Sequence, residues 1–340
     1  MQRIGRLRSL TLALLAVTSG AGATHGQGAD LTADRVRRIG TRTGGVLTLA
    51  AVHLESGEPF SVDATTPVFM SSVVKLPLAV QLLARVDRGE LRLDDSIRVA
   101  PSELSPGHSP LADSFPQGGT FAVRELLRRA ISESDNTAND ALLRYSGGPE
   151  RATAELRRLD LQGVRIDRYY TNYVADYVGV ALPPPEQWSR ALFDTLGRGS
   201  PETRRDSAAV RFMSDTRDRA TAGAILALLR RLHRGTLISP QSTALLLQLM
   251  TESRNPATRI VAGVPAAAQV AHKTGTWGGW RGVSVAVNDV GIVTLPDSSH
   301  LALAILVRQA TRPSAVVDSA IADVTRLLYQ HRWARPRRTR

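Results

Sequence analysis

The order of the expected secondary structure elements limits the fold of this 340-residue chain more than any other feature. Residues 46–53 and 59–63 have the apolar character of β-strands, and such segments return only at 282–287, 291–296 and 300–308. The residues between them are mostly helical in their periodicity. Strands at both ends around a helical middle predict one antiparallel sheet built from both ends of the chain. We therefore expect a two-lobed α+β fold whose site lies in the cleft between the lobes.

Residues 24–330 are expected to form a single domain. The sheet-containing lobe takes about 24–75 and 251–330, and the inserted all-α lobe takes about 76–250. The N-terminal and C-terminal helices should flank the sheet. Apolar periodicity predicts helices at 31–43, 73–88, 122–131, 137–145, 150–159, 220–234, 240–250 and 314–329.

Two segments are expected to be irregular. Asn288 and Asp289 fall between the strand-like segments 282–287 and 291–296, where they predict a turn. Residues 174–210 contain three consecutive prolines and further glycines, and they predict a long loop with one short helix at most. A larger loop, 168–218, encloses this segment.

The net charge of +12 belongs largely to the two ends of the chain. Three arginines lie in residues 1–23 and five in the tail 331–340, so the residues between carry only +4. Residues 1–23 combine a basic start, a short apolar stretch and small residues before Ala23, as a secretory signal does. We expect an exported protein, secreted or periplasmic, without a membrane span once the signal is removed. No pattern of interleaved aromatic and basic residues indicates a nucleic-acid partner.

The histidine and cysteine content argues against metal and cofactor chemistry. The chain has no cysteine, which excludes disulfides, thiolate zinc sites and cysteine nucleophiles. Its seven histidines include no H-x-x-x-H pair, and no glycine loop of the P-loop or Rossmann type occurs. We therefore predict neither a metal site nor a cofactor.

Lysine occurs only twice, at Lys75 and Lys273, among 43 lysines and arginines. Arginine cannot lose its proton in a protein, whereas a lysine amine can act as a base or proton relay. A chain that uses arginine almost everywhere should keep lysine where a titratable amine is needed. The two lysines are therefore the first candidates for catalytic residues.

Both lysines lie in short motifs that also contain hydroxyl groups. Ser72 precedes Lys75 by three residues at the start of an expected helix, so the two side chains share one helix face. Lys273-Thr274-Gly275 follows strand-like sequence, and its glycine allows close backbone approach. Between them lies Ser134-Asp135-Asn136 at a helix junction, where helix capping alone is also a reasonable role. The order S-x-x-K, S-D-N, K-T-G is that of penicillin-recognising serine enzymes.

With these motifs the chain resembles the class A serine β-lactamases and, more broadly, the penicillin-binding proteins. The resemblance covers most of the chain after residue 23 and implies the β-lactamase/transpeptidase-like fold. It is greatest for the extended-spectrum subgroup. Further matching segments are 89–95, Ser109-Pro110 ahead of Thr120, 132–140, 271–276 and 287–292.

The resemblance implies a role for each motif residue. Ser72 would attack the lactam carbonyl, Lys75 would accept or relay its proton, and Ser134, helped by Lys273, would pass a proton to the departing nitrogen. The backbone N–H groups of Ser72 and Thr276 would form the oxyanion hole. The residues implied in substrate binding are Asn136, Thr274, Gly275, Thr276 and Arg281.

One position departs from the family pattern. Class A enzymes release the acyl-enzyme with a glutamate in a loop closed at its neck by an Arg–Asp pair. Arg168 and Asp218 match the neck, but Tyr170 stands where the glutamate is expected. Asp176, Glu186 and Asp167 are the alternative carboxylates that could activate water.

Three hypotheses follow for function. The first is a serine β-lactamase, acting on small β-lactams, whose deacylation is slow or uses another group. The second is a penicillin-binding enzyme that acts on D-Ala-D-Ala peptides, and the third is a binding protein that is acylated without turnover. We expect a monomer in each case.

Overall fold

A five-stranded antiparallel sheet lies at the centre of the molecule, in the order β2-β1-β9-β8-β7. The computed structural model describes residues 23–330, with side chains from residue 31 onward. The strands of this sheet come from both ends of the chain, which confirms the predicted α+β fold. They are β1 (Val46–His53), β2 (Pro59–Val62), β7 (Val270–Trp280), β8 (Val283–Thr294) and β9 (His300–Ala310).

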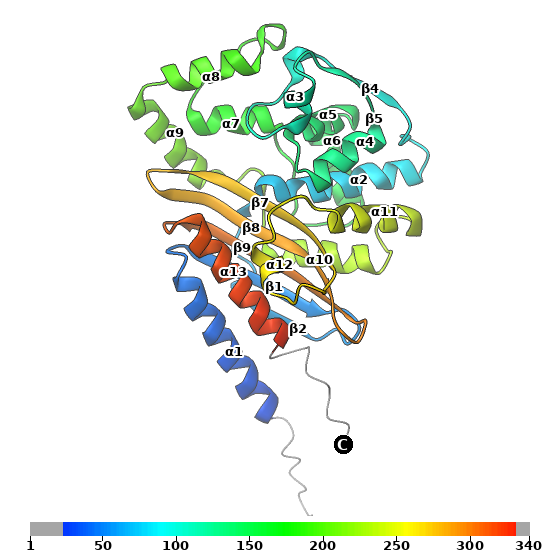
Figure 1. The fold of residues 1–340 in the computed structure, drawn as a ribbon, viewed down its shortest axis with the longest axis vertical. Helices are drawn as coiled ribbons and strands as arrows, with labels where there is room; N and C mark the ends of the chain where they lie inside the picture. Colours follow the sequence, from blue (N-terminus) through cyan, green and yellow to red (C-terminus); the bar gives the residue numbers. More distant parts are fainter. Residues whose placement is uncertain (1–22, 331–340) are drawn as a thin grey trace, which may run out of the picture.

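Helices cover both faces of the sheet (Figure 1). The terminal helices α1 (Ala23–Thr41) and α13 (Ser314–Leu328) lie side by side on one face, with α12 (Arg259–Ala262) nearby. The other face carries α10 (Ala222–His233) and the helical lobe. That lobe includes α2 (Lys75–Asp87), α3 (Pro110–Ser114), α4 (Val123–Ser132), α5 (Asn136–Tyr145), α6 (Gly148–Arg158) and α11 (Pro240–Thr251).

Short elements connect these parts. Two small two-stranded sheets pair β3 (Val68–Phe69) with β6 (Arg219–Ala220), and β4 (Ser96–Val99) with β5 (Gly119–Ala122). The 3-10 helices are η1 (Ser71–Val74), η2 (Pro101–Glu103) and η3 (Pro185–Gln187).

The alternation of side chains along the strands produces two hydrophobic cores. In β9, Leu303 and Ile305 pack with α13 on one face, while Ala304 and Leu306 pack with the helical lobe on the other. Small residues on the lobe side let α10 approach the sheet closely. Because both faces are buried, the strand reads as a nearly continuous apolar run.

The predicted turn at Asn288–Asp289 is wrong. Both residues are fully buried inside one unbroken strand, β8, which pairs with β7 and β9 along its length. The chain reverses earlier, at Arg281 and Gly282, where both residues have positive φ. In the sequence alone, Asn-Asp at a surface turn cannot be told from Asn-Asp in a buried strand, because the hydrogen-bond partners of the two side chains are unknown.

The predicted irregular loop 174–210 is also largely wrong. The segment folds into α7 (Tyr170–Val178), α8 (Arg190–Gly199) and α9 (Glu202–Ser214), joined by the proline-rich stretch around η3. Ser189 caps α8 by accepting a hydrogen bond from the Leu192 N–H. The helices enclose a small hydrophobic core of their own, formed by Ala175, Trp188 and Phe193.

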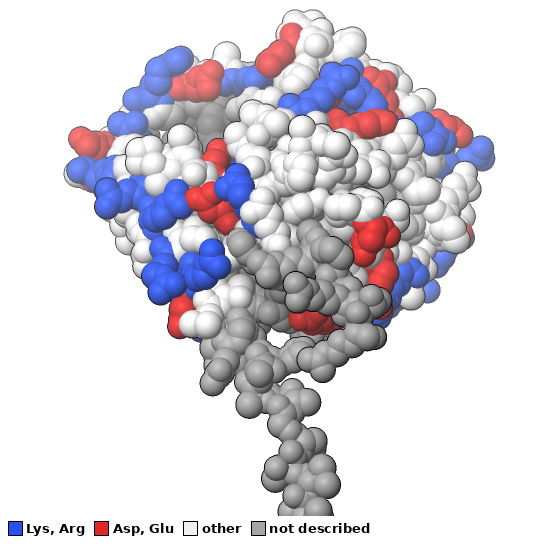
Figure 2. Space-filling model, turned by 60° about the horizontal axis from the view of Figure 1, so that its bottom comes forward, with Lys and Arg blue, Asp and Glu red and all other residues white. Residues whose placement is uncertain are grey.

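Charged residues of both signs lie near one another on the described surface (Figure 2). Arg42, for example, pairs with Asp323, which also pairs with Arg326. No helix within residues 23–330 is long and apolar enough to cross a membrane. The expected signal sequence, 1–23, and the basic tail, 331–340, lie outside the described residues. Ala23 is the one exception, because it is the first residue of α1.

Candidate active site

Ser72 lies in η1, one turn before α2 begins at Lys75. Residues three apart in a 3-10 helix lie directly above one another, so the lysine stands over the serine. The preceding Ser71 has a left-handed backbone with φ of 49°, and its Oγ donates a hydrogen bond of 2.8 Å to the Thr276 carbonyl. This bond fixes η1 to the outer edge of β7.

Gly275 explains why η1 can approach β7 so closely. A Cβ atom at this position would lie 2.6 Å from the Met70 carbonyl and 3.0 Å from the Val73 nitrogen. The first contact is too short for any side chain and the second is very tight, and both neighbours are backbone atoms. The third residue of the K-T-G motif is therefore a steric requirement for placing Ser72 against the strand.

Lys75 is buried and makes several polar contacts. Its Nζ lies 2.9 Å from Ser72 Oγ, 2.9 Å from the Ser134 carbonyl and 2.7 Å from Asn136 Oδ1. The last two partners can only accept hydrogen bonds. A neutral amine has two N–H groups for them, which leaves its lone pair for the Ser72 hydroxyl. The geometry therefore suits removal of the Ser72 proton.

Burial moves the pKa of both lysines in the direction this chemistry needs. It lowers the pKa of Lys75 to about 7, against the opposing charges of Asp135 and Asp140. Burial also brings the pKa of Lys273 well below its ordinary value, and repulsion from Lys75 adds to the effect. Both shifts favour the neutral amine.

Ser134 connects the two lysines. Its Oγ accepts a hydrogen bond of 2.9 Å from Lys273 and lies 3.5 Å from Lys75 Nζ. Its backbone is left-handed, with φ of 58°, an uncommon conformation that is often found at functional sites. The neighbouring Asp135 caps α5 by accepting a hydrogen bond from the Ala138 N–H. Capping and proton relay thus fall to adjacent residues of the same motif.

Thr276 lies on the edge strand of the sheet. The Thr276 carbonyl points at η1, because it accepts a hydrogen bond from the Ser71 hydroxyl. In an antiparallel strand, the N–H and the carbonyl of one residue point to the same side. The Thr276 N–H is therefore directed at the region of Ser72 and not at β8. Thr274, Gly275 and Thr276 together line this edge.

Arg259 is a site residue that the sequence analysis missed. Its guanidinium donates to Thr276 Oγ1 at 2.7 Å and to the Asn288 carbonyl at 2.8 Å, and Asp318 holds it at 2.7 Å. It is buried and has a left-handed backbone with φ of 53°. No sequence signal distinguishes it from the other arginines, because its role depends on α12 packing beside β7 and β8.

Arg281 has a different environment from the one expected of it. It lies in the β7–β8 turn, where it pairs with Asp206 at 2.6 Å and with Glu202 at 2.9 Å on α9. Arg281 follows Thr276 by five residues, which is about 17 Å along an extended strand at roughly 3.4 Å per residue. The guanidinium that contacts Thr276 is that of Arg259.

Asn288 is a second residue whose role was not recognised. Its Nδ2 donates to the carbonyls of Phe69 (2.9 Å) and Met70 (3.1 Å), the two residues before η1 begins. Its Oδ1 accepts a hydrogen bond from the Val307 N–H. A buried amide on β8, the strand next to the edge strand β7, therefore holds the chain that leads into Ser72.

The expected neck of the 168–218 segment is present. Arg168 Nε donates to Asp218 Oδ2 at 2.7 Å, and both side chains are almost completely buried. The Asp218 carbonyl accepts a hydrogen bond of 3.0 Å from the Met70 N–H. The neck is thus joined directly to the segment that carries Ser72.

Tyr170 begins α7 and is largely buried. Its ring packs edge-on against Tyr173 and Trp277, and its hydroxyl lies against Gly107. Burial, helped by the Asp140 charge, raises the pKa of Tyr170 far above its ordinary value. The phenol therefore stays protonated at neutral pH and cannot act as a base.

Asp140 holds Tyr170 in place. Its buried carboxylate accepts hydrogen bonds from the N–H groups of Tyr170 (2.8 Å) and Thr171 (3.3 Å) at the N-terminus of α7. It also accepts from the Ser105 hydroxyl. The carboxylate of Asp140 thus serves as the cap of α7, supplied from α5.

The three alternative carboxylates have other surroundings. Asp176 binds Arg168 at 2.7 Å and Arg217 at 3.0 Å, as part of the neck. Asp167 accepts from the Asp218 N–H and pairs with Arg165. Glu186 is exposed on η3. Two of the three are therefore committed to ion pairs around the neck.

This fold and this cluster of hydroxyls and amines define the class of serine enzymes that recognise penicillins. Comparisons with known proteins agree. The model of the family described as "Beta-lactamase enzyme family" matches residues 31–332. The chain therefore belongs to the beta-lactamase enzyme family, in its class A serine group.

Individual relatives support this assignment. The chain is 29% identical over 276 residues to the extended-spectrum beta-lactamase PER-1 of Pseudomonas aeruginosa. The aligned residues cover 80% of this chain and 78% of the relative. It is 25% identical over 267 residues to beta-lactamase VEB-1 of the same organism, over 77% of each chain. The crystal structure of a beta-lactamase from Chitinophaga pinensis superposes with a TM-score of 0.73 and 30% identity, over 88% of this chain and 98% of that one.

Proposed function

We propose that this protein opens β-lactam rings through an acyl-enzyme on Ser72. The observation that carries the proposal is the position of Lys75, whose amine contacts the Ser72 hydroxyl while its N–H groups are directed to the Ser134 carbonyl and Asn136. Its pKa of about 7 leaves a large fraction neutral at physiological pH, as a general base requires.

The bond changes follow from this arrangement. Ser72 Oγ attacks the lactam carbonyl carbon as its proton passes to Lys75, and the N–H groups of Ser72 and Thr276 stabilise the oxyanion. The carbon–nitrogen bond then breaks, and the nitrogen takes a proton from Ser134, which is replenished from Lys75. Lys273 assists Ser134 across 2.9 Å. Ring opening expels nothing, so the adduct has the mass of the whole antibiotic.

Thr274, Thr276 and Arg259 supply the features that an anionic substrate needs. Thr276 Oγ1 accepts from Arg259, so its own proton is free to be donated to a substrate carboxylate. The positive charge behind the threonine increases the attraction. We assign this role to Arg259 in place of Arg281, whose guanidinium is paired with Asp206.

Deacylation is the step for which the site is poorly equipped. Tyr170 is a buried, protonated phenol, and Asp140, Asp167 and Asp176 each hold backbone or arginine partners. We infer that hydrolysis of the acyl-enzyme is slow. The same observation favours the second candidate function, a penicillin-binding enzyme acting on D-Ala-D-Ala peptides or an acylated binding protein.

One experiment separates these functions. The purified protein is mixed with a penicillin, and lactam absorbance and intact mass are followed together. Sustained loss of absorbance beyond one equivalent supports the β-lactamase, and a persistent adduct after one equivalent supports the second candidate. Absence of any adduct or turnover would overturn the shared mechanism.

We also infer that the protein is exported, to the periplasm or beyond. The support is the pattern of basic, apolar and small residues in residues 1–23. Determination of the N-terminal residue of the protein recovered outside the cytoplasm tests this, because removal of the signal predicts a new start near residue 24.

A further inference from the structure

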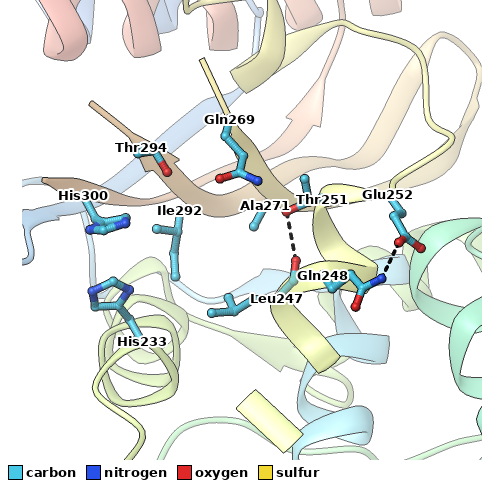
Figure 3. A pocket seen from close by; sticks show the side chains of 10 residues that line it. All are labelled: His233, Leu247, Gln248, Thr251, Glu252, Gln269, Ala271, Ile292, Thr294 and His300. Atoms are coloured by element: carbon cyan, nitrogen blue, oxygen red, sulfur yellow. Dashed lines mark hydrogen bonds between the residues drawn. The ribbon is translucent and has the colours of Figure 1, made fainter. Parts of the chain in front are cut away.

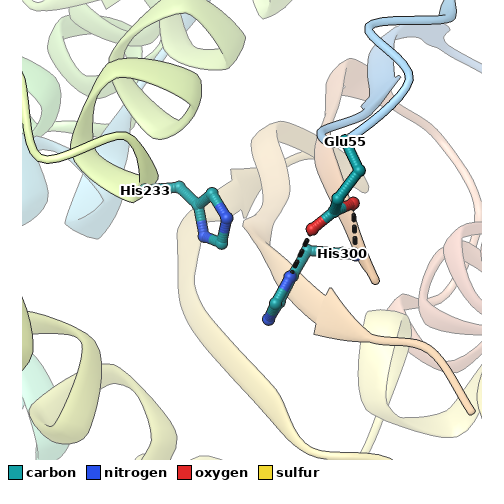
Figure 4. A group of neighbouring side chains, drawn as sticks. All are labelled: Glu55, His233 and His300. Carbon is teal, nitrogen blue, oxygen red and sulfur yellow. Dashed lines mark hydrogen bonds and ion pairs between the residues drawn. The ribbon is translucent and has the colours of Figure 1, made fainter. Parts of the chain in front are cut away.

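A cluster of two histidines and a glutamate lies where β1 ends and β9 begins. Glu55 follows β1, His233 ends α10 and His300 begins β9. Each offers a ligand atom, and these atoms all lie within 4.8 Å of one another. Figure 4 shows the three side chains converging from three separate elements. The sequence analysis predicted no metal site, because residues this far apart in the chain form no motif.

His300 is held in one orientation. Glu55 Oε1 lies 2.7 Å from His300 Nδ1, and Glu55 Oε2 accepts the His300 backbone N–H at 2.8 Å. The Nδ1 atom of His300 and an oxygen of Glu55 therefore already face one another. An ion bound between them would take both as ligands and displace the proton that they share.

The His233 ring has no hydrogen bond within the described part of the chain. It lies 4.5 Å from the His300 ring, centroid to centroid, with the planes tilted by 52°. The ring nitrogens of His233 are therefore not committed to another partner among the described residues.

A cavity opens beside the two histidines. It has a volume of about 380 Å³, and His233 and His300 form part of its wall. Gln248 and Thr251 of α11, and Glu252 directly after α11, lie opposite them (Figure 3). The cavity gives an ion a path of entry and leaves room for a water ligand. The other neighbouring histidine, His53, is already occupied by Ser56 and Ser299.

We propose that Glu55, His233 and His300 bind a divalent transition-metal ion of the zinc type. Two imidazoles and one carboxylate, with a fourth position open to water, are a common zinc ligand set. In a tetrahedral site with bonds of about 2.0–2.1 Å, the ligand atoms lie roughly 3.4 Å apart. The ligand atoms of this cluster lie at most 4.8 Å apart, so binding requires any two of them to approach by no more than about 1.4 Å. Bound metal ties the end of α10 to the sheet.

Zinc binding by the metal-stripped, full-length protein without an affinity tag tests the proposal. Isothermal titration with ZnCl2 should give one site, Co2+ should give the visible absorption of a tetrahedral complex, and Mg2+ should give no response. His233→Phe keeps a ring of similar size but removes a ligand. It should weaken zinc binding more than about 100-fold, beyond the usual loss for an outer-sphere partner. Glu55→Gln should weaken it as well.

His108→Asn is the matched control, because His108 is exposed and its ring contacts the Glu133 carbonyl, away from the cluster. It should bind zinc as the wild type does. The proposal is overturned if the wild type binds no zinc, or if His233→Phe with an unchanged circular dichroism spectrum binds it equally well. The Co2+ spectrum of the wild type decides the question if the variants fail to fold.

Discussion

The motif-bearing core and the segment 168–218 contribute to one site by different means. In the core, Ser72, Lys75, Ser134 and Lys273 are joined by direct hydrogen bonds of at most 3.0 Å. The segment 168–218 instead contributes an ion-paired neck and the ring of Tyr170, which packs against Trp277. Under the proposed function, we expect acylation and deacylation to depend on separate parts of the fold, so that one can be lost without the other.

Replacing Ser72 is expected to have the largest effect, because it removes the only atom that forms the covalent bond. Ser72→Ala should give no adduct with a penicillin in intact mass spectra. Ser207→Ala is the control: the exposed Ser207 hydroxyl donates to the Thr203 carbonyl within α9, and the variant should still be acylated. An adduct on Ser72→Ala would show that another residue is the nucleophile.

Lys75→Arg tests whether the core needs a titratable amine or merely a positive charge. A guanidinium stays protonated, so the acylation rate should fall by about 10²- to 10⁴-fold, the usual contribution of a general base. Stopped-flow or quenched-flow mass spectrometry measures this rate. The exchange Arg254→Lys at an exposed position should leave it unchanged. Near-normal acylation by Lys75→Arg would exclude Lys75 as the base.

Gly275→Ala tests the close approach of η1 to β7. The added methyl group would lie 2.6 Å from the Met70 carbonyl, so the serine turn must shift. A displacement of about 1 Å at a reacting group costs roughly 10²-fold in rate. Gly278→Ala is a matched control on the same strand, where nothing lies within 4 Å of the new atom. Equal acylation rates for the two variants would contradict the steric role of Gly275.

The smallest expected effect is the pH dependence of acylation. The rate should rise about tenfold per pH unit below pH 7 and level off above it, because Lys75 with a pKa of about 7 must lose its proton to act. The unfolded chain keeps this proton to a higher pH, so the contribution of Lys75 to stability rises with pH above 7. A rate that falls between pH 6 and pH 8 would contradict the assignment.

The sequence predicted the core far better than the segment 168–218. Strand and helix periodicity located β1, β9 and α10 to within two residues at each end. The same reasoning failed for Asn288, whose buried partners are the Phe69 and Met70 carbonyls more than 200 residues away. It also failed for α8 and α9, because proline and glycine at their connections hid the helices between them. The monomeric state stays a prediction.

The sequence by itself determined the chemistry of the core, because S-x-x-K places a hydroxyl and an amine together through the fixed geometry of one helical turn. Only the tertiary structure decided what joins distant segments: Arg259 against Thr276, Asn288 against the serine turn, and Glu55 with His233 and His300. Such contacts depend on how helices pack against the sheet. Packing is a property of the whole chain, and no local pattern encodes it.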